Sequence, residues 1–208
     1  MAAGSLPPAR RTNNMCGICG ILNTSGTDEL DRGAIAAMTA ALRHRGPDDS
    51  GIFKDSNVAL GHTRLSIVDL QGGAQPMANE DGTVQIVFNG EIYNFEALRA
   101  ALLDKGHVFK TRSDTEVLVH GYEEYGVALA EKIEGMFAFA IWDAGKQRLF
   151  AARDRAGKKP FYYTRAAGRF IFASEIKSII LHPLVQRRLN PIALHHIFSF
   201  QNVPDGRT

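Results

Sequence analysis

The most constraining feature of the sequence is a series of short β-rich runs separated by turn-forming residues. The runs cover residues 16–23, 51–54, 58–65, 84–88, 108–111, 136–142, 148–152, 161–163 and 170–173. Turn signals such as Glu80-Asp81-Gly82 and Asp143-Ala144-Gly145 separate many of them, as hairpins require. A doubly wound parallel sheet needs a crossover after each strand, so this spacing favours antiparallel sheets.

Helical patterns are fewer than strand patterns. We expect helices at residues 29–44, 95–105, 114–125, 127–133, 174–181 and 191–198. The third has the clearest boundaries, because Ser113 is a typical N-cap, acids fill the first turn and Gly126 follows the last. Many hairpin strands with inserted helices predict an α+β domain, for which 208 residues are enough.

Composition excludes several classes of protein. Hydrophobic residues make up 45% and charged residues 22% of the chain, as in ordinary soluble domains. The net charge of +2 comes from Arg10 and Arg11, so the rest of the chain is neutral. A neutral chain has no overall positive potential to attract nucleic acid or an anionic membrane. No stretch approaches the roughly 18–20 apolar residues of a membrane helix. With two cysteines and no secretory signal, a reducing cytoplasmic compartment is expected.

Cys16 and Cys19 are open to several interpretations. Their spacing is that of half a zinc site, but the sequence has no second cysteine pair and its seven histidines are scattered, so no metal is expected. A redox CxxC would lie between a strand and a helix, whereas this one lies inside a strand-like run. Cys19 is then a small buried hydrophobe, and Cys16 is either a buried thiol or a nucleophile.

Several short segments differ from ordinary strand or loop sequence. They are HRGPD at 44–48, GHTRLSIVD at 61–69, QP at 75–76, NGEIYN at 89–94, SDTEV at 113–117, GMFAFAIWD at 135–143, RDR with a following G and KP within 153–160, and ASEIKS at 173–178. Each has an ordinary explanation when taken alone. Arg64 could be an edge charge, Asn89-Gly90 a hairpin turn and Asp114 only an N-cap.

Together with Cys16, these motifs resemble the class II glutamine amidotransferases, a branch of the N-terminal nucleophile hydrolases. The likeness is greatest to the glutaminase domain of glutamine-hydrolysing asparagine synthetase, whose branch has the HRGPD and RLSIVD forms. It runs in order over almost the whole chain after residue 15. The resemblance implies a four-layer αββα sandwich, with two antiparallel sheets between helices.

The resemblance also implies a mechanism. In this family an N-terminal cysteine attacks the carboxamide of glutamine, a thioester forms as ammonia leaves, and water then releases glutamate. Cys16 would be the nucleophile, with its own α-amine as the base, because an α-amine titrates near pH ~7.7–8.0. Asn89 and Gly90 would be the donors that stabilise the oxyanion.

Substrate-binding residues follow from the same resemblance. Arg64 would bind the α-carboxylate of glutamine through its two-pronged guanidinium. Asp114 would bind the α-ammonium, and Glu91 would add to that end of the site. Further substrate contacts are expected from Asn89 and Gly90, and from main-chain groups at Leu65, Ser66, Ile67 and Val68.

The resemblance divides the chain into a leader (1–15), an amidotransferase domain (16–200) and the start of a linker (201–208). Asparagine synthetases carry a second domain that binds ATP through a Ser-Gly-Gly-x-Asp-Ser run, which this sequence lacks. No cofactor is therefore expected here, ATP and Mg are expected only in the missing domain, and we favour a partial chain over a separate subunit. The expected partners are L-glutamine and the synthetase domain or subunit that receives ammonia. A homodimer is compatible with the sequence.

An amine base requires a free N-terminus, so the active form is expected to begin at Cys16. Translation from Met15 followed by removal of that methionine is favoured over cleavage of a propeptide. Two other functions remain open. One is a non-catalytic module that keeps the fold to hold a partner, and the other is an amidase that acts on a different amide.

Overall fold

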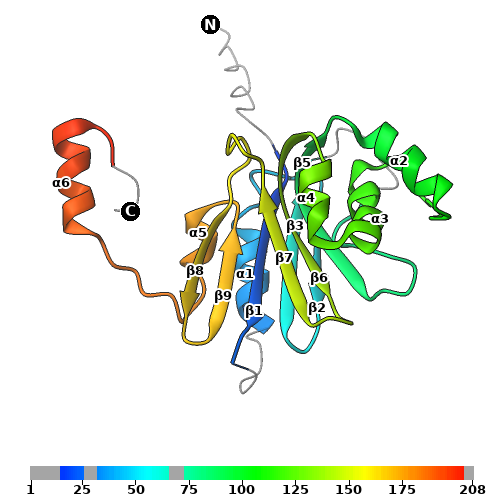
Figure 1. The fold of residues 1–208 in the computed structure, drawn as a ribbon. Coiled ribbons are helices and arrows are strands. Elements are labelled where there is room, and N and C mark those ends of the chain that lie inside the picture. Colours follow the sequence, from blue (N-terminus) through cyan, green and yellow to red (C-terminus); the bar gives the residue numbers. More distant parts are fainter. Residues whose placement is uncertain (1–14, 26–31, 66–72, 204–208) are drawn as a thin grey trace, which may run out of the picture.

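Nine strands form two antiparallel sheets in the centre of the computed structural model, which describes residues 15–25, 32–65 and 73–203 (Figure 1). The strands are β1 (Gly17–Asn23), β2 (Asp49–Lys54), β3 (Val58–Arg64), β4 (Met77–Ala78), β5 (Val84–Ile92), β6 (Gly135–Asp143), β7 (Arg148–Arg153), β8 (Tyr162–Ala166) and β9 (Arg169–Ala173). The five-stranded sheet has the order β2-β3-β1-β9-β8, and the four-stranded sheet has the order β4-β5-β6-β7. Every neighbouring pair is antiparallel, as the turn pattern predicted.

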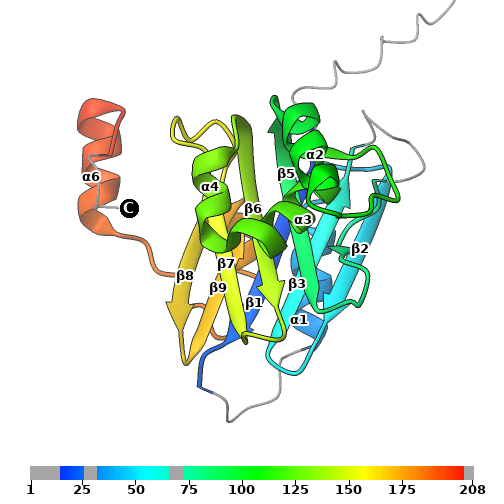
Figure 2. The same cartoon turned by 45° about the vertical axis from the view of Figure 1, so that its right-hand side comes forward.

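Helices cover the outer faces of both sheets (Figure 2). The helical elements of the described residues are α1 (Arg32–Ala40), α2 (Phe95–Asp104), α3 (Asp114–Tyr125), the 3-10 turn η1 (Gly126–Ala128), α4 (Leu129–Lys132), α5 (Ile176–Ile179) and α6 (Pro191–Phe200), of which α6 does not cover a sheet. α1 and α5 pack on the five-stranded sheet, and α3 packs on the four-stranded sheet with α2 and α4 beside it. The side chain of Ser113 caps α3 by accepting from the N–H of Thr115 at 3.2 Å.

Period-two alternation in the strands divides the core between the layers. The cluster between the sheets contains Ile18, Val58, Leu60, Val87, Ala138, Ala140, Trp142 and Phe172. Residues on the opposite strand faces pack under the helices. Ile21 shares a cluster with Met38 of α1, and Ile86 shares one with Leu118 of α3. The order helix, sheet, sheet, helix confirms the predicted α+β four-layer fold.

The same alternation brings the predicted site residues to one place. Cys16 lies two residues before Ile18, so it projects from the same side of its chain toward the second sheet. Arg64 ends β3 on the face that carries other members of the inter-sheet cluster, and Asn89 follows Val87 by two residues in β5. The start of β1, the end of β3 and the C-terminal half of β5 thus direct these side chains to one edge of the interface between the sheets.

The prediction that a strand ends at Phe88 and turns at Asn89-Gly90 is wrong. β5 continues to Ile92, and Asn89 and Gly90 lie opposite Ala138 and Phe137 of β6. The physical reason is that β6 starts at Gly135 and offers a partner to each of these residues. Asn89 is therefore held in a sheet and not in a loop.

The predicted strand at residues 108–111 is also absent from the described structure. Glu116 of α3 takes the place of a neighbouring strand there, since its carboxylate accepts the backbone N–H groups of Lys110 and Thr111, each at 2.7 Å. The helix expected at 29–44 begins at Arg32 and ends at Ala40, and residues 29–31 lie outside the described part. The helix expected at 174–181 is reduced to the single turn α5.

α6 stands apart from the two sheets in both Figure 1 and Figure 2. Several of its apolar side chains are exposed, including Ile197, Phe198 and Phe200. Within the described ranges no helix has the length and apolar character needed to cross a membrane.

Candidate active site

A cavity of about 170 Å³ lies where β3, β5 and the N-terminus of α3 meet. The predicted site residues that line it are Cys16, Arg64, Leu65, Asn89, Gly90, Glu91 and Asp114. Ser66, Ile67 and Val68 lie outside the described residues. The fold thus gathers residues from four separate motifs around one small volume.

The Cys16 thiol lies against the main chain of Leu65. The N–H of Leu65 is 3.4 Å from Sγ, and the Leu65 carbonyl oxygen is 3.8 Å from it. Burial raises the pKa of the Cys16 thiol above its ordinary value of 9.0, and the hydrogen bond with Leu65 and the charge of Arg64 oppose this rise. A thiol in these surroundings needs a base to react at neutral pH.

Arg45 fixes the backbone of the nucleophile candidate. Its Nε donates to the carbonyl oxygen of Cys16 at 3.1 Å, and its Nη1 pairs with Oε1 of Glu175 at 3.1 Å. His44 contacts the same carboxylate oxygen at 2.9 Å. These residues belong to the HRGPD and ASEIKS motifs, for which the sequence indicated no role, and the structure shows that they meet each other beside Cys16.

Asn89 presents an unused donor at the cavity. The residue is 1% exposed, and its Nδ2 has no hydrogen-bond partner among the described residues. A buried amide donor without a partner is unfavourable unless a ligand supplies the acceptor. The next position must be glycine, because a Cβ on Gly90 would lie 2.7 Å from the Phe88 ring and 2.8 Å from Cα of Phe137.

Two side chains hold the backbone immediately before Asn89. Gln75 accepts the N–H of Phe88 at 2.7 Å, and His62 donates from Nε2 to the Phe88 carbonyl at 3.1 Å. Gln75 also donates to Thr115 of α3 at 3.3 Å. Burial lowers the pKa of His62 to about 4, so the imidazole is neutral at physiological pH and its single proton serves this bond. The sequence indicated no role for either side chain, although both lie in the motifs noted above.

The opposite charges expected to bind an amino acid both line the cavity. Arg64 is buried at the end of β3, and Asp114 is at the first turn of α3. Oδ2 of Asp114 accepts the N–H of Ile92 at 3.2 Å. Burial raises the pKa of Asp114, the hydrogen bond from Ile92 lowers it, and the neighbouring charge of Glu91 raises it.

Lys159 also lines the cavity, although the sequence indicated no role for it. Its Nζ lies 3.1 Å from Sδ of Met15, and its backbone N–H donates to Asp154 at 3.0 Å. Arg153 donates from Nε to the Lys159 carbonyl at 2.6 Å. Burial lowers the pKa of Lys159, and the charge of nearby Arg45 lowers it further. Lys159 belongs to the KP motif, but the sequence alone did not indicate that its amine lies at the cavity next to Met15.

A larger hollow, of about 690 Å³, lies at the other end of β1. Its lining includes Leu22, Leu149, Arg165 and Phe170, and none of the predicted site residues contributes to it. Reactive and charged side chains converge on the smaller cavity, so we take that cavity as the candidate active site.

Known proteins share both the sequence and the fold. The family model of the glutamine amidotransferase domain matches residues 15–208. Glutamine-hydrolyzing asparagine synthetase 3 of Bacillus subtilis is 45% identical over 187 residues, which are 89% of this chain and 30% of that protein. Asparagine synthetase 3 of Arabidopsis thaliana is 43% identical over 166 residues, 79% of this chain and 28% of that protein. The chain therefore spans about a third or less of the length of these relatives.

Among solved structures, the glutamine phosphoribosylpyrophosphate amidotransferase of B. subtilis has a TM-score of 0.67 at 22% identity. The match covers 80% of this chain and 43% of that one. At such identity the likeness concerns the fold alone, and it agrees with the layered arrangement above. The family match, the relatives and the fold confirm what the motifs indicated: the chain belongs to the class II glutamine amidotransferase domain family.

Proposed function

We propose that this chain hydrolyses L-glutamine to glutamate and ammonia through a thioester on Cys16. The observation that carries the proposal is the buried Nδ2 of Asn89, which has no partner among the described residues and lines the same cavity as the thiol. An oxyanion that forms next to Sγ would supply the missing acceptor. A preorganised donor of this kind typically accounts for about 10²–10³ in rate.

The proposed nucleophile needs a free α-amine. Sγ of Cys16 attacks Cδ of glutamine while the α-amine accepts the thiol proton, and that proton leaves with the amide nitrogen as ammonia. Water then attacks the thioester, releases glutamate and restores the thiol. Met15 supports the need for removal of the leader, because it lines the cavity and its Sδ contacts Lys159.

The two ends of the substrate match the charges of the cavity. In the proposal, Arg64 binds the α-carboxylate, and Asp114 with Glu91 binds the α-ammonium. Main-chain groups of Leu65 and of residues 66–68 complete the site. An amide without the amino acid end would make neither of these two charged contacts, which accounts for selectivity.

We further propose that residues 16–200 supply ammonia to an asparagine synthetase-type reaction in a second domain or subunit, which would bind ATP and Mg. The glutaminase chemistry itself uses no cofactor. Exposed apolar side chains on α6, among them Phe198 at 80% exposure, support a covering partner at this end of the chain. Sequencing beyond residue 208 tests this part, and we expect an in-frame Ser-Gly-Gly-x-Asp-Ser segment. A homodimer remains compatible with the proposal.

The decisive assay uses a chain that begins at Cys16. It should release glutamate and ammonia in equal amounts, and acid-quenched samples should carry a glutamyl adduct on Cys16 by mass spectrometry. The matched Cys16→Ala chain should show neither. Equal rates in both chains would leave a non-catalytic module as the better description.

Substrate choice separates glutaminase from another amidase. L-Glutamine should be preferred over short amides that lack the α-amino and α-carboxyl groups. A preference for the short amides would remove the roles proposed for Arg64 and Asp114.

A further inference from the structure

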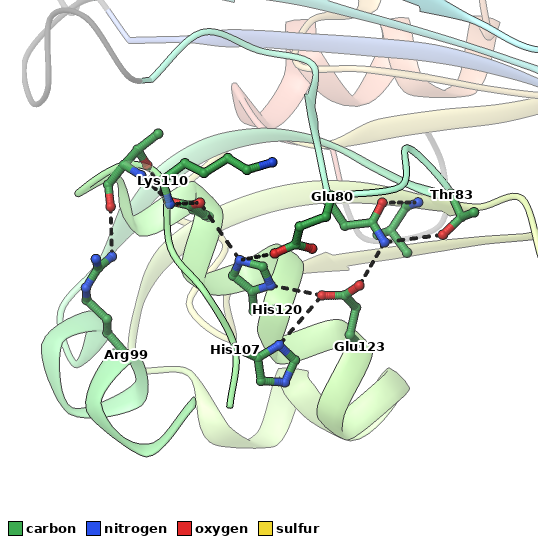
Figure 3. Close-up of polar contacts among 11 residues, drawn as sticks. Glu80, Thr83, Arg99, His107, Lys110, His120 and Glu123 are labelled. Carbon is green, nitrogen blue, oxygen red and sulfur yellow. Dashed lines mark hydrogen bonds and ion pairs between the residues drawn. The ribbon is translucent and has the colours of Figure 1, made fainter. Parts of the chain in front are cut away.

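Two histidines and several glutamates gather around α3 (Figure 3), and none of them lines the cavity. His120 and Glu123 lie on α3, and His107 lies on the segment between α2 and α3. Glu116 comes from the preceding turn of α3, and Glu80 comes from the chain between β4 and β5. We call these five residues the His107–His120 cluster. It does not depend on the proposed glutaminase activity.

A single proton cannot satisfy both ring nitrogens of His120, because each of them faces a carboxylate. The residue is 1% exposed, and its Nδ1 lies 2.9 Å from Oε2 of Glu123. Its buried Nε2 has no hydrogen bond among the described residues and faces Glu80 at 3.7 Å and Glu116 at 3.8 Å. A neutral imidazole carries one N–H, so its other nitrogen directs a lone pair at a carboxylate. A second proton or a metal ion is needed at one of these nitrogens.

The position of His107 indicates where a metal ion could bind. Its Nδ1 lies 3.8 Å from Oε2 of Glu123, and its ring centroid lies 5.1 Å from that of His120. One ligand atom from each of His107, His120 and Glu123 lies within 4.8 Å of the other two. In a tetrahedral zinc site, bonds of about 2.0–2.2 Å place two ligand atoms roughly 3.4 Å apart. Small side-chain rotations would bring all three atoms onto one ion.

Neighbouring side chains can hold the proposed metal ligands Glu123 and His120 in place through hydrogen bonds. Asn79 donates from Nδ2 to Oε1 of Glu123 at 2.7 Å, which leaves Oε2 directed at the histidines. With a metal on Nδ1, the proton of His120 moves to Nε2, where it faces the carboxylates of Glu80 and Glu116. Metal-bound histidines usually donate their other N–H to a carboxylate in this way. Nε2 lies 3.7 and 3.8 Å from these carboxylates, so a small shift of either side chain would complete the hydrogen bond.

The local charge also favours a cation. Glu80, Glu116, Glu123 and Glu124 surround the two rings, and Lys105 pairs with Glu124 at 2.6 Å. Four carboxylates against one lysine give these groups an excess of negative charge. A divalent ion would offset it.

We propose that His107, His120 and Glu123 bind a divalent transition metal ion, best matched by zinc, with water completing its coordination. Two histidines and one glutamate are a common protein ligand set for zinc. This differs from the sequence expectation of no metal, because the two histidines are far apart along the chain and meet only where the segment before α3 folds back onto the helix. The ion would fasten that segment, which leads into Ser113 and Asp114, to α3.

The test uses the Cys16→Ala chain, so that the cavity thiol cannot bind the probe. Titration with Zn²⁺ by calorimetry should show one equivalent, and Co²⁺ should give the absorption bands of a four-coordinate site. His107→Gln and Glu123→Gln should each weaken binding by more than 10-fold, and Asn79→Ala, which removes an outer-shell contact, should weaken it by about 10–100-fold. His195→Gln, an exposed histidine on α6, is the matched control and should bind zinc normally.

Two results would overturn the proposal. The first is zinc binding that is absent, or equally strong in His107→Gln and Glu123→Gln chains whose thermal unfolding shows that they are folded. The second is an NMR measurement in which both ring nitrogens of His120 stay protonated in excess zinc at neutral pH. In that case a proton, and not a metal, supplies the missing charge.

Discussion

Replacing Gln75 with leucine tests whether the backbone before Asn89 is positioned by side chains. The substitution removes the acceptor that lies 2.7 Å from the N–H of Phe88, in a buried position. A buried donor left without a partner typically costs about 1–3 kcal/mol of folding free energy. For a chain of this size, each kcal/mol lowers the melting temperature by roughly 2–4 °C, so we expect a fall of about 2–12 °C.

Turnover should fall as well, because Phe88 directly precedes the proposed oxyanion donor Asn89. His62 still donates to the Phe88 carbonyl, so the donor is displaced and not lost. We therefore expect less than the ~10²–10³ loss that follows removal of a whole oxyanion donor, about 10-fold in kcat. The Michaelis constant for glutamine should change little, since the oxyanion exists only along the reaction path.

The assay combines thermal unfolding with glutamine hydrolysis by chains that begin at Cys16. Gln85→Leu is the matched control, because Gln85 lies on β5, the strand that contains Phe88, but away from the cavity. The reasoning is refuted if Gln75→Leu keeps both its melting temperature and its turnover. It is also refuted if Gln85→Leu loses as much turnover as Gln75→Leu does.

Three further predictions concern the cavity residues. Arg64→Lys should raise the Michaelis constant for glutamine by 10-fold or more, because a point charge cannot reproduce a two-pronged contact, and an unchanged constant would place Arg64 outside the substrate site. Asn89→Ala should lower kcat by about 10²–10³ with little change in binding, and the opposite pattern in steady-state kinetics would make Asn89 a ground-state contact. Burial raises the pKa of Asp114 above 3.8, so its carboxylate loses its charge at a higher pH than an ordinary aspartate does. As the pH falls through that raised pKa, the Michaelis constant for glutamine should therefore rise. The Asp114→Asn chain should have a high Michaelis constant at every pH. Parallel pH profiles for the unaltered and Asp114→Asn chains would contradict the proposed role of Asp114 in binding the α-ammonium.

The β-rich runs that contain Cys16 and Arg64 could be predicted from the sequence, because strand patterns depend on residues a few positions apart. Cys16 directly precedes β1, and Arg64 is the last residue of β3. The N-cap of α3 at Ser113 and the position of Asp114 in the first turn could also be predicted, because helix caps depend on neighbouring residues. Each of these features depends on residues a few positions apart.

What could not be predicted depends on contacts between distant parts of the chain. The Asn89-Gly90 pair is typical of hairpin turns, but β6 pairs with it and keeps it extended. Lys159 reaches Met15 across 144 positions, and Arg45 reaches Glu175 across 130. No pattern within a short window indicates such meetings, although the motifs that contain these residues could be recognised.

The central claim is that Cys16 reacts with its own α-amine as the base, and one comparison tests it most directly. Glutamine hydrolysis is measured for a chain that begins at Cys16 and for the full 208-residue chain, with both N-termini checked by intact mass. While Met15 is attached, the nitrogen of Cys16 is an amide that cannot accept a proton, and general base catalysis contributes about 10²–10⁴ in rate. We predict that the full chain is slower by at least about 10²-fold. Equal hydrolysis by a preparation in which every molecule retains residues 1–15 would contradict the account.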